Sequence, residues 1–398
     1  SFRNNQFGAA LGGPIVRDKT FFYVDYEGQR ERVGLNSLAR VPTPGEIAQT
    51  RTDIADAGGT VSPVIDALLQ RNPWPAPNIN LNAALWAGDS NASVTTPAYN
   101  PINSFIGKVD HNFDSNNLLT GRYYLGDSAQ SFPLALVGGG ILPGYNTFTP
   151  TRVNLVSISY VRVFSSTQVN EVRFGYNRFA EDFLPEDREF DPASIGINTG
   201  VAARDTGLPF MRFSGLTALG STLSVPRGRK DTNWQFIDSF SWKFKRHEMK
   251  FGYEFRRTSI NSFFDAGYRG RIDFRHGDIQ TSLYNFLSGI PSGGRQAKGD
   301  SDRQTFQNSH AGYFQDSYRM NPKFTFNYGV RWDYYGVIGE KSGLLSNFDA
   351  VNGLRMVGGA NLPRLYERDL NNFAPRASLA YDLTGKGKTV IRAGYGFF

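Results

Sequence analysis

The sequence predicts an all-β chain that forms a transmembrane antiparallel β-barrel, with short periplasmic turns and long extracellular loops. Three observations lead to this fold class. Apolar and polar residues alternate with period two in about twelve segments. Short and long connections alternate strictly between those segments. No run approaches the roughly 18 consecutive apolar residues that a membrane-spanning helix needs.

Composition excludes several classes of protein. The 398 residues contain no cysteine and four histidines, so we expect no disulfide framework, no thiolate chemistry and no His-rich metal centre. Aromatic residues make up 14% of the chain, which is too many for a disordered protein. The net charge of +7 comes from scattered residues of both signs, so we expect no nucleic-acid partner, which would require a basic stripe.

The strands are recognised in chain order by their alternation. Segment 324–335 shows it most clearly, because the even positions are all apolar or aromatic and the odd positions are polar or small except for Tyr335. A strand sorts such residues onto opposite faces, whereas a helix would scatter them around its axis. Comparable alternation is found at 22–26, 119–125, 156–160, 169–181, 233–245, 247–259, 377–381 and 391–397.

The connections between these strands point to a barrel. Tight turns are expected at 17–19, 114–116, 164–167, 245–246, 321–322 and 384–388. Long connections are expected at 32–102, 128–151, 183–231, 260–307 and 338–372. A soluble β-sandwich has no reason to place every long loop at one end, whereas transmembrane barrels do so. Both the sandwich and the barrel would carry period-two strands.

The first long connection, 32–102, is predicted to be a folded extracellular loop with short helical segments. Ser62 is expected to cap a helix that has Pro63 in its first turn. Val64, Ile65, Leu68 and Leu69 would then share one face of that helix.

The alternation assigns side chains to two environments. The predicted lipid-facing residues are Phe174, Tyr176, Phe251, Tyr253, Phe255, Phe326, Tyr328, Val330, Trp332, Leu379 and Tyr381. The predicted lumen-facing residues are Glu171, Arg173, Lys250, Glu254, Arg256, Arg331, Asp333, Arg376 and Arg392. These charged residues could line a ligand path. Alternatively, they pair with opposite charges on neighbouring strands and have a structural role.

The loops supply the candidate ligand contacts. Trp74, Trp86, Tyr99 and Tyr145 could stack on a solute, or they could pack within the loops themselves. No catalytic residue, metal site or cofactor is predicted. The run Gly385-Lys386-Gly387-Lys388-Thr389 lacks the first glycine of a phosphate-binding loop and instead indicates a hairpin turn.

Segment 5–28, which reads NQFGAALGGPIVRDKTFFYVDYEG, resembles a block found in TonB-dependent outer-membrane receptors. The similarity is to the Oar-like branch, whose members carry a carboxypeptidase-regulatory-like domain. Segments 41–44, 75–78 and 392–398 resemble the same branch. The resemblance implies a larger, 22-stranded barrel filled by a plug. Residues 1–398 would then be a partial outer-membrane barrel domain that starts inside the barrel and stops partway round it.

The same resemblance implies a function in the outer membrane of a Gram-negative bacterium. Such a receptor imports a large or scarce solute, such as a glycan, a peptide or a metal chelate, using the inner-membrane proton-motive force. The expected partners are outer-membrane lipid, the solute, and the TonB complex through a region that precedes this chain. Two alternatives are a passive porin or structural or adhesion barrel, and a soluble β-rich binding module.

Overall fold

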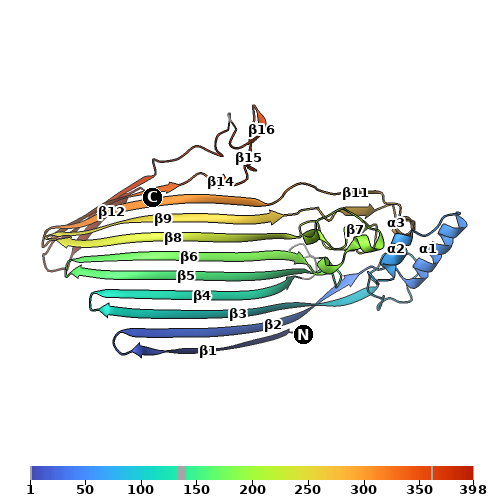
Figure 1. The fold of residues 1–398 in the computed structure, drawn as a ribbon, viewed down its shortest axis with the longest axis horizontal. Helices are drawn as coiled ribbons and strands as arrows, with labels where there is room; N and C mark the ends of the chain where they lie inside the picture. Colours follow the sequence, from blue (N-terminus) through green and yellow to red (C-terminus); the bar gives the residue numbers. More distant parts are fainter. Residues whose placement is uncertain (1, 133–139, 360–361, 398) are drawn as a thin grey trace.

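The computed structural model describes residues 2–132, 140–359 and 362–397 as one large curved sheet with a folded body at one end (Figure 1). Twelve strands lie side by side in chain order, which confirms the predicted all-β class and the strand number. The strands are β1 (Phe2–Val16), β2 (Thr20–Ala39), β3 (Ala92–Asp114), β4 (Asn117–Phe132), β5 (Thr147–Ser165), β6 (Gln168–Pro185), β8 (Arg227–Phe244), β9 (His247–Phe264), β12 (Arg303–Asn321), β13 (Phe324–Tyr335), β17 (Phe373–Asp382) and β18 (Val390–Gly396).

Every neighbouring pair in this sheet is antiparallel. The longest pairing joins β2 to β3, from Thr20 opposite His111 to Ala39 opposite Ala92. Strand pairing therefore continues further than predicted, and the first long connection is reduced to residues 40–91. Most strands exceed the roughly 9–11 residues that cross a bilayer. The sheet is open, with β1 and β18 at its two edges.

The tight turns gather at the end of the sheet opposite the folded body (Figure 1). Asp18 and Lys245 adopt φ angles of 61° and 54°, which lets the chain reverse within a few residues. In the 383–389 turn, the Asp382 carboxylate accepts hydrogen bonds from the main-chain N–H groups of Gly385 and Gly387 at 3.0 and 2.8 Å. Both glycines have positive φ, as the predicted hairpin turn requires.

The loops at the other end fold together into a body that we call the loop cap. It is built from residues 40–91, 186–226 and 265–302, together with Leu142 and Tyr145. It contains helices α1 (Pro44–Asp56), α2 (Pro63–Leu69) and α3 (Ile279–Leu287) and the short turns η2 (Glu186–Glu189), η3 (Pro192–Ile195) and η4 (Ala203–Asp205). Strands β7 (Phe210–Phe213), β10 (Arg271–Phe274) and β11 (Gly293–Arg295) form its small sheet.

The loop cap has a hydrophobic core of its own. Phe286 of α3 packs edge-on against Trp74, Phe213 and Phe274, with ring centroids 5.1–5.5 Å apart. Because these side chains come from three connections far apart in sequence, burying them fixes the connections to one another.

The remaining short strands are β14 (Gly339–Glu340), which pairs with β12, and the hairpin β15 (Ser346–Asp349) and β16 (Gly353–Met356).

The helices differ in how well they were anticipated. Helix α2 begins at Pro63, as predicted, but the Ser62 side chain makes no capping hydrogen bond. Helix α1 lies within the loop for which short helical segments were expected, although its position was not predicted, and α3 was not predicted. Their signals were present as the capping box of Thr43 and Glu46 and as the cap at Asp278. None of the helices in the described residues is long and apolar enough to span a membrane.

Candidate functional site

Strand register sorts the side chains of the large sheet onto two faces. The nine charged residues singled out from the sequence share one face, which we call the polar face. One of its rows runs through Arg173, Ile237, Glu254, Ala311 and Asp333 on consecutive strands. The eleven apolar residues singled out from the sequence share the other face, which we call the apolar face.

The centre of the polar face carries a network of paired charges. Glu254 accepts hydrogen bonds from Gln235 at 2.7 Å and from Arg256 at 3.0 Å. Arg331 pairs with Asp333 at 2.8 Å and lies 3.9 Å from Glu254. The small side chain of Ala311 lies between β9 and β13, and a cavity of about 110 Å³ borders these groups. Four of the predicted residues are therefore brought together as a charge-paired cluster.

The other predicted polar residues lie apart from this cluster. Arg173 forms a pair with Glu171 at 2.6 Å, and Ser159 donates to the same carboxylate at 3.1 Å. Lys250 and Arg376 lie on one row, linked through Gln315 and Gly329. Within the described part of the chain, no ion pair involves Lys250, Arg376 or Arg392. The polar face thus holds cations without an ion-pair partner on β9 and, at its C-terminal edge, on β17 and β18.

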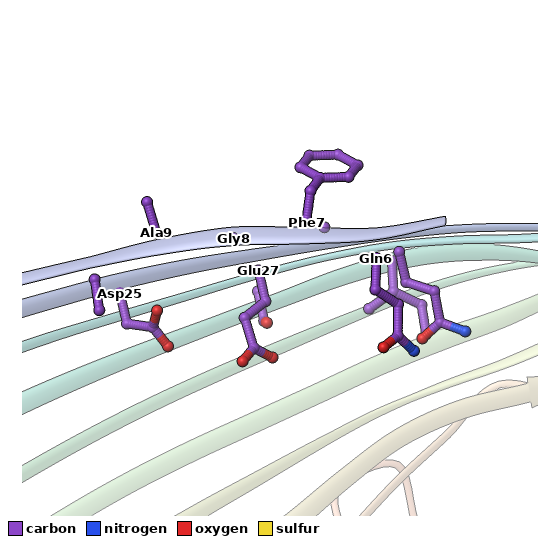
Figure 2. A pocket seen from close by; sticks show the side chains of 11 residues that line it. Gln6, Phe7, Gly8, Ala9, Asp25 and Glu27 are labelled. Carbon is purple, nitrogen blue, oxygen red and sulfur yellow. The ribbon is translucent and has the colours of Figure 1, made fainter. Parts of the chain in front are cut away.

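A polar pocket of about 510 Å³ lies at the opposite edge, on β1, β2 and β3 (Figure 2). Gln6, Asp25 and Glu27 project to one side of the ribbon, while Phe7 and Ala9 project to the other side (Figure 2). Gly8 faces Glu27, and a Cβ on Gly8 would lie 2.6 Å from the Tyr26 carbonyl oxygen, so only glycine leaves this space open. Sequence reasoning missed this pocket.

The four predicted loop aromatics occupy different environments. Trp74 is only 9% exposed, and its indole N–H donates to the Thr217 carbonyl at 3.0 Å. Tyr145 is 8% exposed, and Trp86 packs against the same core. These three rings therefore pack within the loops, which was one of the two roles considered for them, the other being to stack on a solute. Tyr99 lies in β3 rather than in a loop, and its side chain is exposed.

The loop cap carries a broad cleft of about 630 Å³ that sequence reasoning did not identify. Its charged lining consists of Arg271, Arg295 and Lys298, and its walls include the glycines at 200, 270 and 294. Arg271 is held by Asp273 at 3.1 Å, whereas Arg295 and Lys298 make no ion pair within the described residues. A cleft lined by cations and open main chain suits a ligand with oxygen acceptors.

Buried charged side chains form ion pairs and hydrogen bonds within the loop cap. Arg40 and Glu46 form an ion pair with 7% and 1% of their side chains exposed. Burial alone would raise the pKa of Glu46, but Arg40 and the main-chain N–H groups of Thr43 and Trp86 lower it below its ordinary value.

Elsewhere in the loop cap, burial and the neighbouring Asp265 carboxyl group raise the pKa of Asp205 to about 7. Arg204 donates to Asp265 at 2.6 Å beside it.

No group of three or more histidine and carboxylate side chains is arranged in the described residues to hold an ion. Asp302 accepts hydrogen bonds from Arg204 at 3.1 and 3.2 Å.

A sheet of twelve antiparallel strands, with one apolar face, one charged face, short turns at one end and folded loops at the other, defines a membrane β-barrel protein. The outer membrane beta-barrel domain family matches the chain over residues 1–398. The chain belongs to this family, and the protein is located in the outer membrane of a Gram-negative bacterium. A sequence search of curated proteins finds no match.

Solved structures of outer-membrane transporters and receptors are similar to this chain. The transporter YddB from Escherichia coli is 9% identical, with a TM-score of 0.52 over 99% of this chain and 38% of its own. The ferripyoverdine receptor of Pseudomonas aeruginosa is 10% identical, with a TM-score of 0.49 over 99% of this chain and 40% of its own. The ferric-catecholate import receptor Fiu of E. coli K12 is 10% identical, with a TM-score of 0.47 over 99% of this chain and 48% of its own. The chain thus spans less than half the length of these structures.

Proposed function

We propose that this chain forms part of the barrel of a TonB-dependent receptor of the Oar-like branch, within a barrel of 22 strands. In this proposal the apolar face meets lipid, and the nine charged residues of the polar face line the lumen. The protein imports a large or scarce solute, driven through the TonB complex by the inner-membrane proton-motive force. No side chain is assigned a catalytic role.

The observation that carries the proposal is the loop cap at the mouth of the strands. Three long connections share one hydrophobic core there and carry a cleft of about 630 Å³. A capture site whose loops are already packed together suits a receptor, because a pre-ordered site binds its ligand without the entropy cost of ordering loops. The resemblance of segment 5–28 to TonB-dependent receptors supports the energised mode of uptake.

The residues that line the cleft also indicate the chemical class of the solute. Arg295 and Lys298 have no carboxylate partner, and glycine at three positions exposes main-chain groups. A metal chelate, an acidic glycan fragment or a carboxylate-bearing peptide offers the oxygen acceptors that such a surface binds.

The test uses the full-length protein that contains this chain, with ferric citrate, an acidic oligosaccharide and a glutamate-rich peptide as probes. We expect one probe class to bind the purified receptor in calorimetry and to be taken up by cells. Deleting TonB should abolish this uptake while the solute still binds to the cell surface. Uptake that persists without TonB would contradict the proposal and would indicate a passive pore.

A variant pair assigns the bound probe to the cleft. Replacing Arg295 and Lys298 by glutamine should weaken binding by about tenfold for each charge-assisted hydrogen bond lost. Arg188→Gln is the matched control, because Arg188 lies in the same cap but does not line the cleft. Equal binding by all three proteins would exclude the cleft as the capture site.

A further inference from the structure

A group of cations lies on the apolar face, where the long-loop ends of three strands meet. Ala180 of β6 faces Arg152 of β5 on one side and Lys230 of β8 on the other. Arg178 lies two residues from Ala180 along β6, on the same face. Because adjacent strands are about 4.8 Å apart, these three side chains emerge within roughly 10 Å of one another. We call them the convex basic cluster.

The aromatic residues beside this cluster indicate how deep in the membrane it lies. Tyr176 and Trp234 are opposite each other in the register, and their ring centroids are 4.5 Å apart. Arg178 follows Tyr176 by two residues towards the loop end, and Lys230 lies four residues from Trp234 in the same direction. Aromatic side chains of membrane barrels form girdles at the level of the lipid headgroups. The cations therefore lie at the outer headgroup level, beyond the hydrocarbon.

The charge of the cluster is only partly neutralised. Arg152 pairs with Asp127 at 3.2 Å, and Asp182 is the other carboxylate close by, near Lys230. Arg178 and Lys230 are exposed and make no ion pair or hydrogen bond with any described residue. Unpaired cations that border a lipid-facing surface fit an anionic lipid headgroup, which can satisfy both the charge and the hydrogen-bond donors.

We propose that the convex basic cluster binds the phosphate groups of an outer-leaflet glycolipid. The long loops of an outer-membrane barrel face the cell exterior, so the leaflet beside the cluster is the outer one. The acyl chains of the lipid would continue along the apolar face below, over Tyr176 and Trp234. This interaction surface is independent of the solute and of the energy source for uptake.

The experiment measures lipid binding by the full-length protein in nanodiscs, titrated with lipid A that carries its phosphates. Replacing both Arg178 and Lys230 by glutamine should weaken binding by about fivefold per cation, or roughly 25-fold in total. Both side chains are exposed and unpaired, so the fold should survive. Heat-modifiable migration in gels confirms that each variant is folded.

Arg162→Gln is the matched control. Arg162 lies on the same strand and the same face as Arg152, but near the short turn at the opposite end. The Arg162 variant should bind lipid A as tightly as the unaltered protein does. As a second control, the unaltered protein should bind phosphatase-treated lipid A weakly, with the same affinity that the double variant has for intact lipid A. Undiminished binding by the double variant, or an equal loss in the Arg162 variant, would overturn the proposal.

Discussion

Glu46 shows how a single buried charge can organise a loop. Its carboxylate accepts hydrogen bonds from Arg40 and from the main-chain N–H groups of Thr43 and Trp86, the last at 2.8 Å. One side chain thus joins the end of β2, the start of α1 and a residue forty positions further on. Removing one member of a buried pair leaves the other charge uncompensated, which is costly.

Glu46→Gln should therefore destabilise the loop cap by about 3 kcal/mol. Hydrogen exchange in residues 40–91 of the full-length protein measures this as lost protection. Because the pKa of Glu46 is lowered by folding, its contribution is present above the ordinary carboxyl pKa and is lost as pH falls below it. Glu189→Gln is the control, since Glu189 is 87% exposed in its pair with Arg188. Equal protection in both variants would contradict the expectation.

Asp205 predicts the opposite pH dependence. Its raised pKa of about 7 means that the folded state retains a proton that the unfolded chain loses above about pH 4. The stabilisation is fully present below the unfolded pKa and is lost as pH rises through about 7. Proteolysis of the 186–226 connection should accelerate between pH 5 and 8, after correction for the activity of the protease.

Asp205→Asn should remove this pH dependence, because an amide mimics the protonated carboxyl group and does not titrate. Glu189→Gln, in the same connection, should leave it in place. A pH profile that is identical in the unaltered protein and in the Asp205 variant would show that another group is responsible.

At the scale of elements, α1 depends on its N-terminal cap. Thr43 accepts the N–H of Glu46 at 3.1 Å, while the Glu46 side chain accepts the N–H of Thr43 at 2.9 Å. Thr43→Ala should destabilise the helix by about 1 kcal/mol. Hydrogen exchange within α1 measures the loss. Thr52→Ala is the control, because Thr52 is exposed within the same helix and alanine favours helix. A larger loss from the control would contradict this account.

The strands were predictable and the loop cap was not, for a physical reason. Alternation such as that of 324–335 is a local pattern, and its period alone identifies a strand with two unlike faces. The contacts of Trp74 with Phe213 and Phe286 join residues far apart in sequence, and nothing local to Trp74 specifies them. The pocket at Asp25 and Glu27 was overlooked because it depends on the glycine that faces Glu27 across the strand pair.

At the scale of the whole molecule, charge is distributed unevenly over the polar face. Asp25 and Glu27 near the β1 edge have no cationic partner among the described residues, while Arg376 of β17 and Arg392 of β18, at the other edge, have no anionic one there. Between them, the cluster around Glu254 is internally paired. Under the proposed function, a solute that crosses the polar face would therefore meet regions of opposite sign.

The two edges of the sheet lead to the last prediction. Along β1 and β18, the main-chain groups on the outer side have no strand partner among the described residues, and Phe2, Leu11 and Ile15 of β1 are more than 60% exposed. Unpaired edges of this length recruit other chains, because each added strand satisfies the N–H and C=O groups. Under the proposal that residues 1–398 form part of a larger barrel, this segment refolded alone in detergent should therefore form heterogeneous oligomers by light scattering, whereas the complete receptor should be monodisperse. A monodisperse, heat-modifiable species from residues 1–398 alone would mean that the two edges are satisfied within the chain.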